Sequence, residues 1–65
     1  MTKQVKYVVE MYKTRRFQMG EYVFATEDDV QAFLEDMNDF ELDNIIDICK
    51  YSGGRCYHIY GEFLD

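Results

Sequence analysis

Apolar and polar residues alternate along residues 4–12, which is the pattern of a half-buried β-strand. One face of this predicted strand is uniformly apolar and consists of Val5, Tyr7, Val9 and Met11. The polar stretch 13–20 predicts a loop, with Gly20 near its end, and residues 21–25 predict a second strand. We expect the second strand to return antiparallel to the first.

The period of the pattern changes after residue 25. Apolar side chains recur there with the spacing i, i+3, i+4 and i+7: Val30, Phe33, Leu34 and Met37. Thr26 precedes Asp29 by three residues, as in a capping box, and the carboxylates of residues 27–29 suit the positive end of a helix dipole. These features predict a helix over residues 27–38.

A glycine pair divides the last third of the chain into two predicted strands, residues 45–51 and 55–63. Gly53 and Gly54 supply the positive φ angles that a two-residue hairpin turn needs. The resulting register places Cys49 opposite His58. One face of the hairpin is then clearly the more apolar and carries Ile46, Ile48, Tyr57, Ile59 and Phe63. With residues 39–44 as an acidic connection, we predict an α+β fold of the ββαββ type, a small antiparallel sheet with one helix packed on one face.

Length and composition are typical of a single folded domain, residues 1–65. Apolar residues make up 48% of the chain and proline is absent, which is unlike a disordered acidic tail. A core of this size supplies at most roughly 3–5 kcal/mol, so a partner or an oligomer could matter for stability. No apolar run has the length of a membrane span, and the first residues do not begin a secretory signal. Two cysteines in such a chain indicate a reducing cytoplasm.

Charge is distributed unevenly along the chain, whose formal net charge is −6. No lysine, arginine or histidine occurs between Phe17 and Cys49, whereas ten carboxylates do, and five of the seven bases precede residue 17. A surface of one sign steers a protein toward partners of the opposite sign. Proteins that handle nucleic acid have basic grooves, because they neutralise phosphates.

Carboxylates near the end of the predicted helix lack a local structural reason. Glu35, Asp36 and Asp39 crowd its C-terminus, where the dipole disfavours anions, and Glu35 and Asp39 form a like-charge i, i+4 pair. A solvated face is the ordinary explanation, but locally unfavourable choices often mark function. We therefore predict a partner-binding surface with charged residues and two aromatic anchors: Glu35, Asp36, Asp39, Phe40, Glu41, Asp43 and Tyr51.

Metal binding and catalysis have less support in the sequence. Cys49, Cys56 and His58 share the outer face of the predicted hairpin, but no fourth ligand or Cys-x-x-Cys spacing accompanies them. Residues 39–43 begin like a calcium-binding loop, but Asn44 stands where that loop needs glycine. We therefore predict no metal and no cofactor. One histidine and no phosphate-binding glycine loop favour a protein that is not an enzyme.

Several residues resemble those of the Dmd-like antitoxins of T-even bacteriophages: Val5-Lys6, Lys13, Glu21, Asp28-Asp29-Val30-Gln31 and Cys56. The resemblance covers roughly the first half of the chain in register. The acidic connection over residues 39–43 and the long final strand depart from the pattern of that family. The resemblance implies a phage protein in the cytoplasm of an infected bacterium, which binds a host RNase toxin directly and occludes its active site.

These observations predict a non-enzymatic inhibitor that docks its acidic segment into the basic cleft of a host nucleic-acid-processing protein, an RNase toxin or a defence nuclease. The inhibitor itself would contact neither nucleic acid nor membrane. One alternative is a DNA mimic that acts on a CRISPR, restriction or nucleoid protein. Another is a homo-oligomeric structural or metal-binding protein that uses the face with Cys49, Cys56, His58 and the tyrosines. The sequence leaves homodimerisation open.

Overall fold

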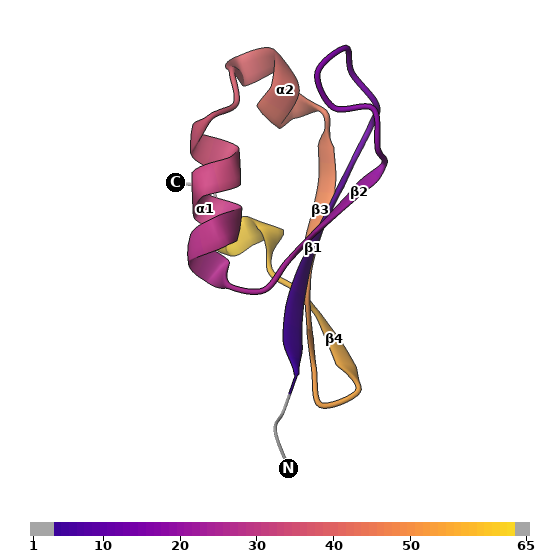
Figure 1. Cartoon of the computed structure of the whole chain (residues 1–65), viewed down its shortest axis with the longest axis vertical. Helices are drawn as coiled ribbons and strands as arrows, with labels where there is room; N and C mark the ends of the chain where they lie inside the picture. The colour runs from indigo at the N-terminus through magenta and orange to yellow at the C-terminus, as the bar shows by residue number, and fades with distance from the viewer. Residues whose placement is uncertain (1–3, 64–65) are drawn as a thin grey trace.

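Four antiparallel strands form one sheet in the computed structural model, which describes residues 4–63 (Figure 1). The order of the strands across the sheet is β2-β1-β3-β4. Their bounds are Val5–Met11 for β1, Glu21–Phe24 for β2, Ile45–Ser52 for β3 and Arg55–His58 for β4. The predicted α+β class, with a helix on one face of an antiparallel sheet, is confirmed.

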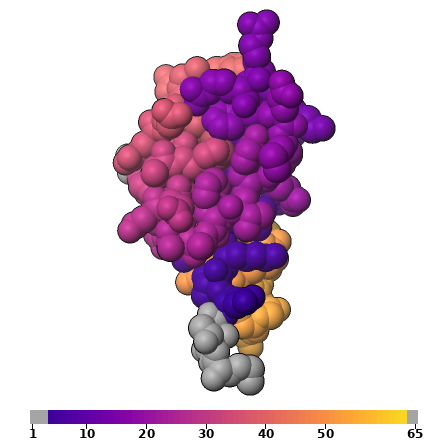
Figure 2. All heavy atoms as spheres, viewed as in Figure 1, coloured from indigo at the N-terminus to yellow at the C-terminus, as the bar shows by residue number. Residues whose placement is uncertain are grey.

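Three helical segments accompany the sheet: α1 over Glu27–Glu35, the short α2 over Asp39–Asp43, and the 3-10 helix η1 over Tyr60–Phe63. Helix α1 runs alongside the sheet, whereas α2 and the β3–β4 hairpin lie at opposite ends of the long axis (Figure 1). Helices α1 and α2 and the violet β1–β2 segment form the broad end of the molecule, and the orange hairpin with the start of β1 forms a narrower end (Figure 2). None of the helices described is long and apolar enough to cross a membrane.

The core lies between α1 and the face of the sheet that carries Tyr7, Val9 and Met11. Val9, Val30 and Ile48 are fully buried there. An aromatic cluster closes one side of this core, because the rings of Phe17, Tyr22 and Phe24 lie 4.9–5.2 Å from that of Phe33. Such pairs add to the stability that burial alone provides.

Helix α1 begins as predicted and ends earlier than predicted. The Thr26 hydroxyl accepts a hydrogen bond from the Asp29 amide and caps the N-terminus. The helix ends with Asp36 as its C-cap, and Asn38 is extended with φ −86° and ψ 175°. Asn38 begins α2 with a reciprocal capping box, in which its side chain and that of Glu41 each accept an amide of the other residue. The acidic connection predicted for residues 39–44 is therefore a second helix.

The β3–β4 hairpin has the predicted register, with Cys49 paired with His58 and positive φ angles at Gly53 and Gly54. Ile46 does not share the buried face of Ile48, although the predicted register placed the two side chains together. A bulge between Glu10 and Met11 pairs Met11 with Ile45, so that Ile45 is buried and Ile46 is 49% exposed.

The last strand is also shorter than predicted. Beyond His58, the Ile59 amide still donates to the Ile48 carbonyl. The chain then leaves the sheet and turns into η1. Ile59 is buried and Phe63 packs against the core from this 3-10 helix.

Candidate functional site

The base-free segment forms a largely exposed acidic surface on α1 and α2. Seven of its carboxylate residues between positions 27 and 43 are exposed: Glu27, Asp28, Asp29, Glu35, Asp36, Asp39 and Asp43. The first three occupy the first turn of α1 and Asp39 that of α2, where helix dipoles favour anions. Glu35, Asp36 and Asp43 lie at helix C-termini, where dipoles do not favour them.

The like-charge pair that the sequence predicts on one helix does not form. Glu35 is the last residue of α1, whereas Asp39 is the first residue of α2. The extended backbone at Asn38 separates the two helices, so the i, i+4 geometry does not apply. Repulsion between Glu35 and Asp39 within a helix is therefore not a reason to assign function to them.

Glu41 has a structural environment that its neighbours lack. It is only 5% exposed, and its Oε2 atom lies 2.9 Å from Arg16 Nε. Arg16 also donates to the backbone carbonyl and to the carboxylate of Asp36, at 3.1 and 3.2 Å, and lies over the Phe17 ring. Arg16 thus ties the loop between β1 and β2 to both helices. Glu41 is therefore not part of the exposed acidic surface, and Arg16 partly neutralises the charge of Asp36.

Phe40 lies on the solvent side of α2. It is 67% exposed, and Asp39 and Asp43, also exposed, belong to the same helix. The Asn44 side chain donates to the Phe40 carbonyl at 2.7 Å and satisfies a backbone acceptor near the end of α2. An aromatic ring held on a capped helix is suited to anchor a partner.

Tyr51 does not join this surface. It lies near the far end of β3, paired with Lys6 of β1 and Cys56 of β4, and the hairpin is at the opposite end of the molecule from α2 (Figure 1). The Lys6 ammonium lies 5.5 Å from the centre of its ring. The structure therefore brings together Glu35, Asp36, Asp39, Phe40 and Asp43, and leaves Tyr51 on the sheet.

A cluster of potential metal ligands lies on the outer face of the sheet, opposite the core. The ligand atoms of Cys49, Cys56 and His58 lie within 4.8 Å of one another. Asp47 adds a carboxylate to them, because its Oδ2 atom lies 3.4 Å from Cys49 Sγ and 2.5 Å from His58 Nδ1. Asp47 was not among the candidate ligands predicted from the sequence. Its position two residues before Cys49 on one strand, and hence on the same face, was the available signal.

Burial and hydrogen bonding within this cluster shift the pKa values of Cys49 and Asp47 in opposite directions. Burial, and then the hydrogen bond with Asp47, raise the pKa of the Cys49 thiol to about 12. Burial also opposes ionisation of Asp47, but its hydrogen bonds with His58 and Cys49 outweigh that effect and lower the pKa of the Asp47 carboxyl. Thiol and carboxylate both meet the same Nδ1 atom of His58. A nucleophilic triad instead needs them on opposite nitrogens of the imidazole, so the cluster is not arranged as a catalytic cysteine site.

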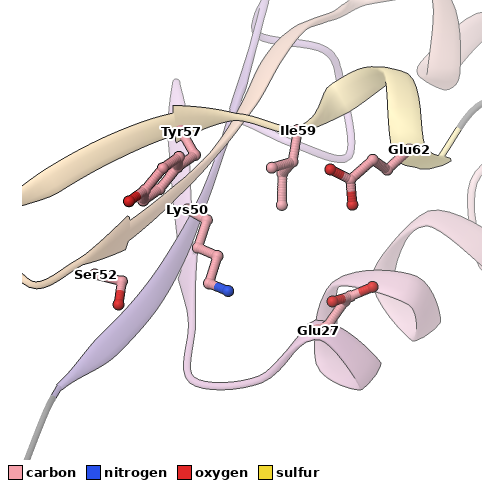
Figure 3. Close-up of a pocket in the computed structure, with 6 residues that line it drawn as sticks. All are labelled: Glu27, Lys50, Ser52, Tyr57, Ile59 and Glu62. Carbon is pink, nitrogen blue, oxygen red and sulfur yellow. The ribbon is translucent and has the colours of Figure 1, made fainter.

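A hollow of about 300 Å³ lies on the helix side of the sheet, next to the β3–β4 hairpin (Figure 3). Its lining mixes charged, polar and apolar side chains: Glu27, Lys50, Ser52, Tyr57, Ile59 and Glu62. The amino group of Lys50 points into the hollow from β3, and Glu27 lies across it at the start of α1 (Figure 3). The opposite charges in this lining give it no strong preference for an anion or a cation.

The protein is thus a small two-layer α+β domain. The end with α2 carries the acidic surface, and the cysteine and histidine side chains lie on the outer face of the sheet at the hairpin. No protein-family model, curated protein or solved structure matches the chain.

Proposed function

We propose that this protein is a small non-enzymatic inhibitor that binds a host nucleic-acid-processing protein and blocks its basic cleft. The docking surface would consist of the C-terminal end of α1 and the solvent side of α2. The observation that carries the proposal is the exposure of Phe40 together with that of Glu35, Asp39 and Asp43, in a segment without a base.

The charges of this surface are free to act on a partner. Within residues 4–63, no side chain forms an ion pair with Glu35, Asp39 or Asp43, whereas Asp36 and Glu41 share Arg16. Unpaired carboxylates keep their full attraction for a cationic groove. These carboxylates are negatively charged, like the phosphates that such a groove normally binds.

Phe40 adds what charge alone does not supply. Exposed charges at the rim of an interface mainly change the association rate and its dependence on salt. Most of the affinity comes from a few buried anchors, which are often aromatic. An exposed phenylalanine flanked by carboxylates combines electrostatic steering with an apolar contact in one place.

The resemblance to Dmd-like antitoxins supports an RNase toxin as the kind of target, in the cytoplasm of an infected bacterium. In that setting the inhibitor occludes the active site by direct binding and lets the infection proceed. A toxin that cleaves RNA has a cationic substrate groove, which is the electrostatic complement of the α1–α2 surface.

The test is affinity capture from a bacterial lysate with the bound proteins identified by mass spectrometry, using three forms of the protein. One is the natural chain, and the second carries Glu35→Gln, Asp39→Asn and Asp43→Asn. The third is a matched control with Glu21→Gln, Glu27→Gln and Glu62→Gln, which removes three exposed carboxylates outside the proposed surface. We expect the natural chain and the control to capture the same nuclease, and the second form to lose it. Equal capture by all three forms would show that these carboxylates are not part of the docking surface.

The target class is tested by adding competitors to the same capture. RNA that displaces the captured protein supports an RNA-cleaving target. Displacement by duplex DNA but not by RNA would instead assign the surface to mimicry of DNA.

A further inference from the structure

The narrow end of the molecule is held by few apolar contacts. All four residues of β4 are exposed, and this strand lies at the edge of the sheet. Of the hairpin, only Ile48 and Cys49 of β3 and Ile59 just after β4 are buried beyond the bulge. Two-stranded hairpins without a packed face are marginally stable in water, so this end of the domain would gain most from a cross-link.

Four side chains with metal-binding atoms lie at this point, two from each strand of the hairpin. Cys49 Sγ lies 3.5 Å from His58 Nδ1 and 3.4 Å from Asp47 Oδ2. Cys56 Sγ lies within 4.8 Å of the corresponding atoms of Cys49 and His58. Zinc bonds of about 2.0–2.3 Å in a tetrahedron place neighbouring ligand atoms roughly 3.3–3.8 Å apart. The two distances from Cys49 already fall in that range.

The types of ligand indicate which ion would bind. Two thiols and an imidazole are the ligands of structural zinc, and a carboxylate oxygen is an accepted fourth ligand. Calcium and magnesium prefer oxygen atoms alone. Glu10 lies opposite Asp47 on β1, and its carboxylate is within 4.8 Å of the ligand atoms of Asp47 and Cys49, which adds to the negative potential around a cation.

We propose that Cys49, Cys56, His58 and Asp47 form a binding site for a zinc-like divalent ion, which fastens β4 to β3 across the hairpin. The two thiols lose their protons to solvent on binding. The imidazole gives up to solvent the Nδ1 proton that faces Asp47 and binds through Nδ1 in its neutral form, with a proton on Nε2. Asp47 Oδ2, which contacts Nδ1 in this structure, then moves from the imidazole to the ion.

The site is independent of the proposed inhibitory surface, because the hairpin and α2 lie at opposite ends of the molecule (Figure 1). Its role is structural. Since the ion binds the folded hairpin and not the unfolded chain, its binding energy adds to the stability of the fold. Small domains near the lower size limit commonly use a metal in this way.

The experiment is a titration of reduced, metal-free protein with Co²⁺, a spectroscopic probe for zinc sites, followed by Zn²⁺. We expect saturation at one equivalent, visible bands of a tetrahedral ion, a near-ultraviolet band from thiolate ligands, and loss of all of them when zinc displaces cobalt. The melting temperature should rise with added zinc. The absence of a saturable cobalt spectrum would overturn the proposal.

Variants test the assignment of the ligands. Cys56→Ser and His58→Gln change exposed side chains, so the fold should survive, as checked by circular dichroism. Cys56→Ser should halve the thiolate band or abolish binding. Asp47→Asn should weaken zinc binding by roughly 10- to 100-fold, and Glu21→Gln, on β2, should leave it unchanged. A cobalt spectrum in Cys56→Ser identical to that of the natural chain would contradict the site.

Discussion

Glu41 and Asp43 lie two residues apart on the same short helix and have opposite environments. Glu41 is buried, caps α2 together with Asn38 and pairs with Arg16. Asp43 is exposed, and within residues 4–63 no ion pair involves it. The two faces of α2 therefore separate a carboxylate that holds the fold together from one that is free to meet a partner. A count of acidic residues along the sequence does not distinguish these two roles.

The largest effect should come from removing the structural carboxylate. Glu41→Ala loses the hydrogen bond to the Asn38 amide and the ion pair with Arg16, and we expect the free energy of unfolding to fall by about 2 kcal/mol. Asp43→Ala on the other face should change it by less than about 0.5 kcal/mol. Urea unfolding followed by circular dichroism measures both. Equal losses in the two variants would show that the faces of α2 do not differ as described.

Phe40→Ala should separate binding from stability. The ring is mostly exposed, so its removal should leave the unfolding midpoint nearly unchanged. The dissociation constant for the captured partner should rise by about tenfold or more, which corresponds to about 1.4 kcal/mol. Isothermal titration calorimetry supplies this constant. Full affinity in Phe40→Ala would exclude this ring as the anchor.

A smaller effect should distinguish the two partners of Arg16. Double-mutant cycles of Arg16→Gln with Glu41→Gln and with Asp36→Asn compare the ion pair to a buried carboxylate with the pair to an exposed one. We expect a coupling free energy of about 1 kcal/mol for the buried pair and less than about 0.5 kcal/mol for the exposed pair. The opposite order would mean that Arg16 is held mainly by Asp36.

The smallest predicted effect concerns the dependence of folding stability on pH in the acid range. Because the folded-state pKa of Asp47 is lowered, its ionised form stabilises the fold above the unfolded value of about 3.9 and this contribution is lost as the pH falls through the folded value. Asp47→Asn should therefore make the decline of stability below about pH 4 shallower. Thermal melts of the two proteins between about pH 2 and pH 6 test this. Parallel curves would contradict the assignment.

Local patterns predicted the parts of the fold that depend on local chemistry. Alternation placed Val9 in the core, the Thr26 cap fixed the start of α1, and Gly53-Gly54 determined the hairpin register that pairs Cys49 with His58. Helix α2 was also predictable, because Asn38 and Glu41 have the spacing of a capping box.

Other features depend on contacts that no local pattern reveals. The bulge that buries Ile45 and exposes Ile46 arises from the pairing of β3 with β1, more than thirty residues away in the chain. The contact of Arg16 with Glu41 joins the loop after β1 to a helix 25 residues later in the chain, and nothing in either segment alone indicates it. For this reason the predicted surface included Glu41, which is internal, and Tyr51, which lies on the sheet.

The central claim is that the solvent side of α2 and the end of α1 bind a cationic cleft. The most direct test measures the dissociation constant of the purified partner for the natural chain, for the Glu35→Gln, Asp39→Asn, Asp43→Asn variant and for the Glu21→Gln, Glu27→Gln, Glu62→Gln control, at low salt. Three exposed charges, at about 0.2–1 kcal/mol each, predict a loss of roughly 3- to 150-fold in the first variant. The control, with the same net charge, should bind like the natural chain. An equal loss in both variants would contradict a localised surface, and no loss in either would contradict the claim itself.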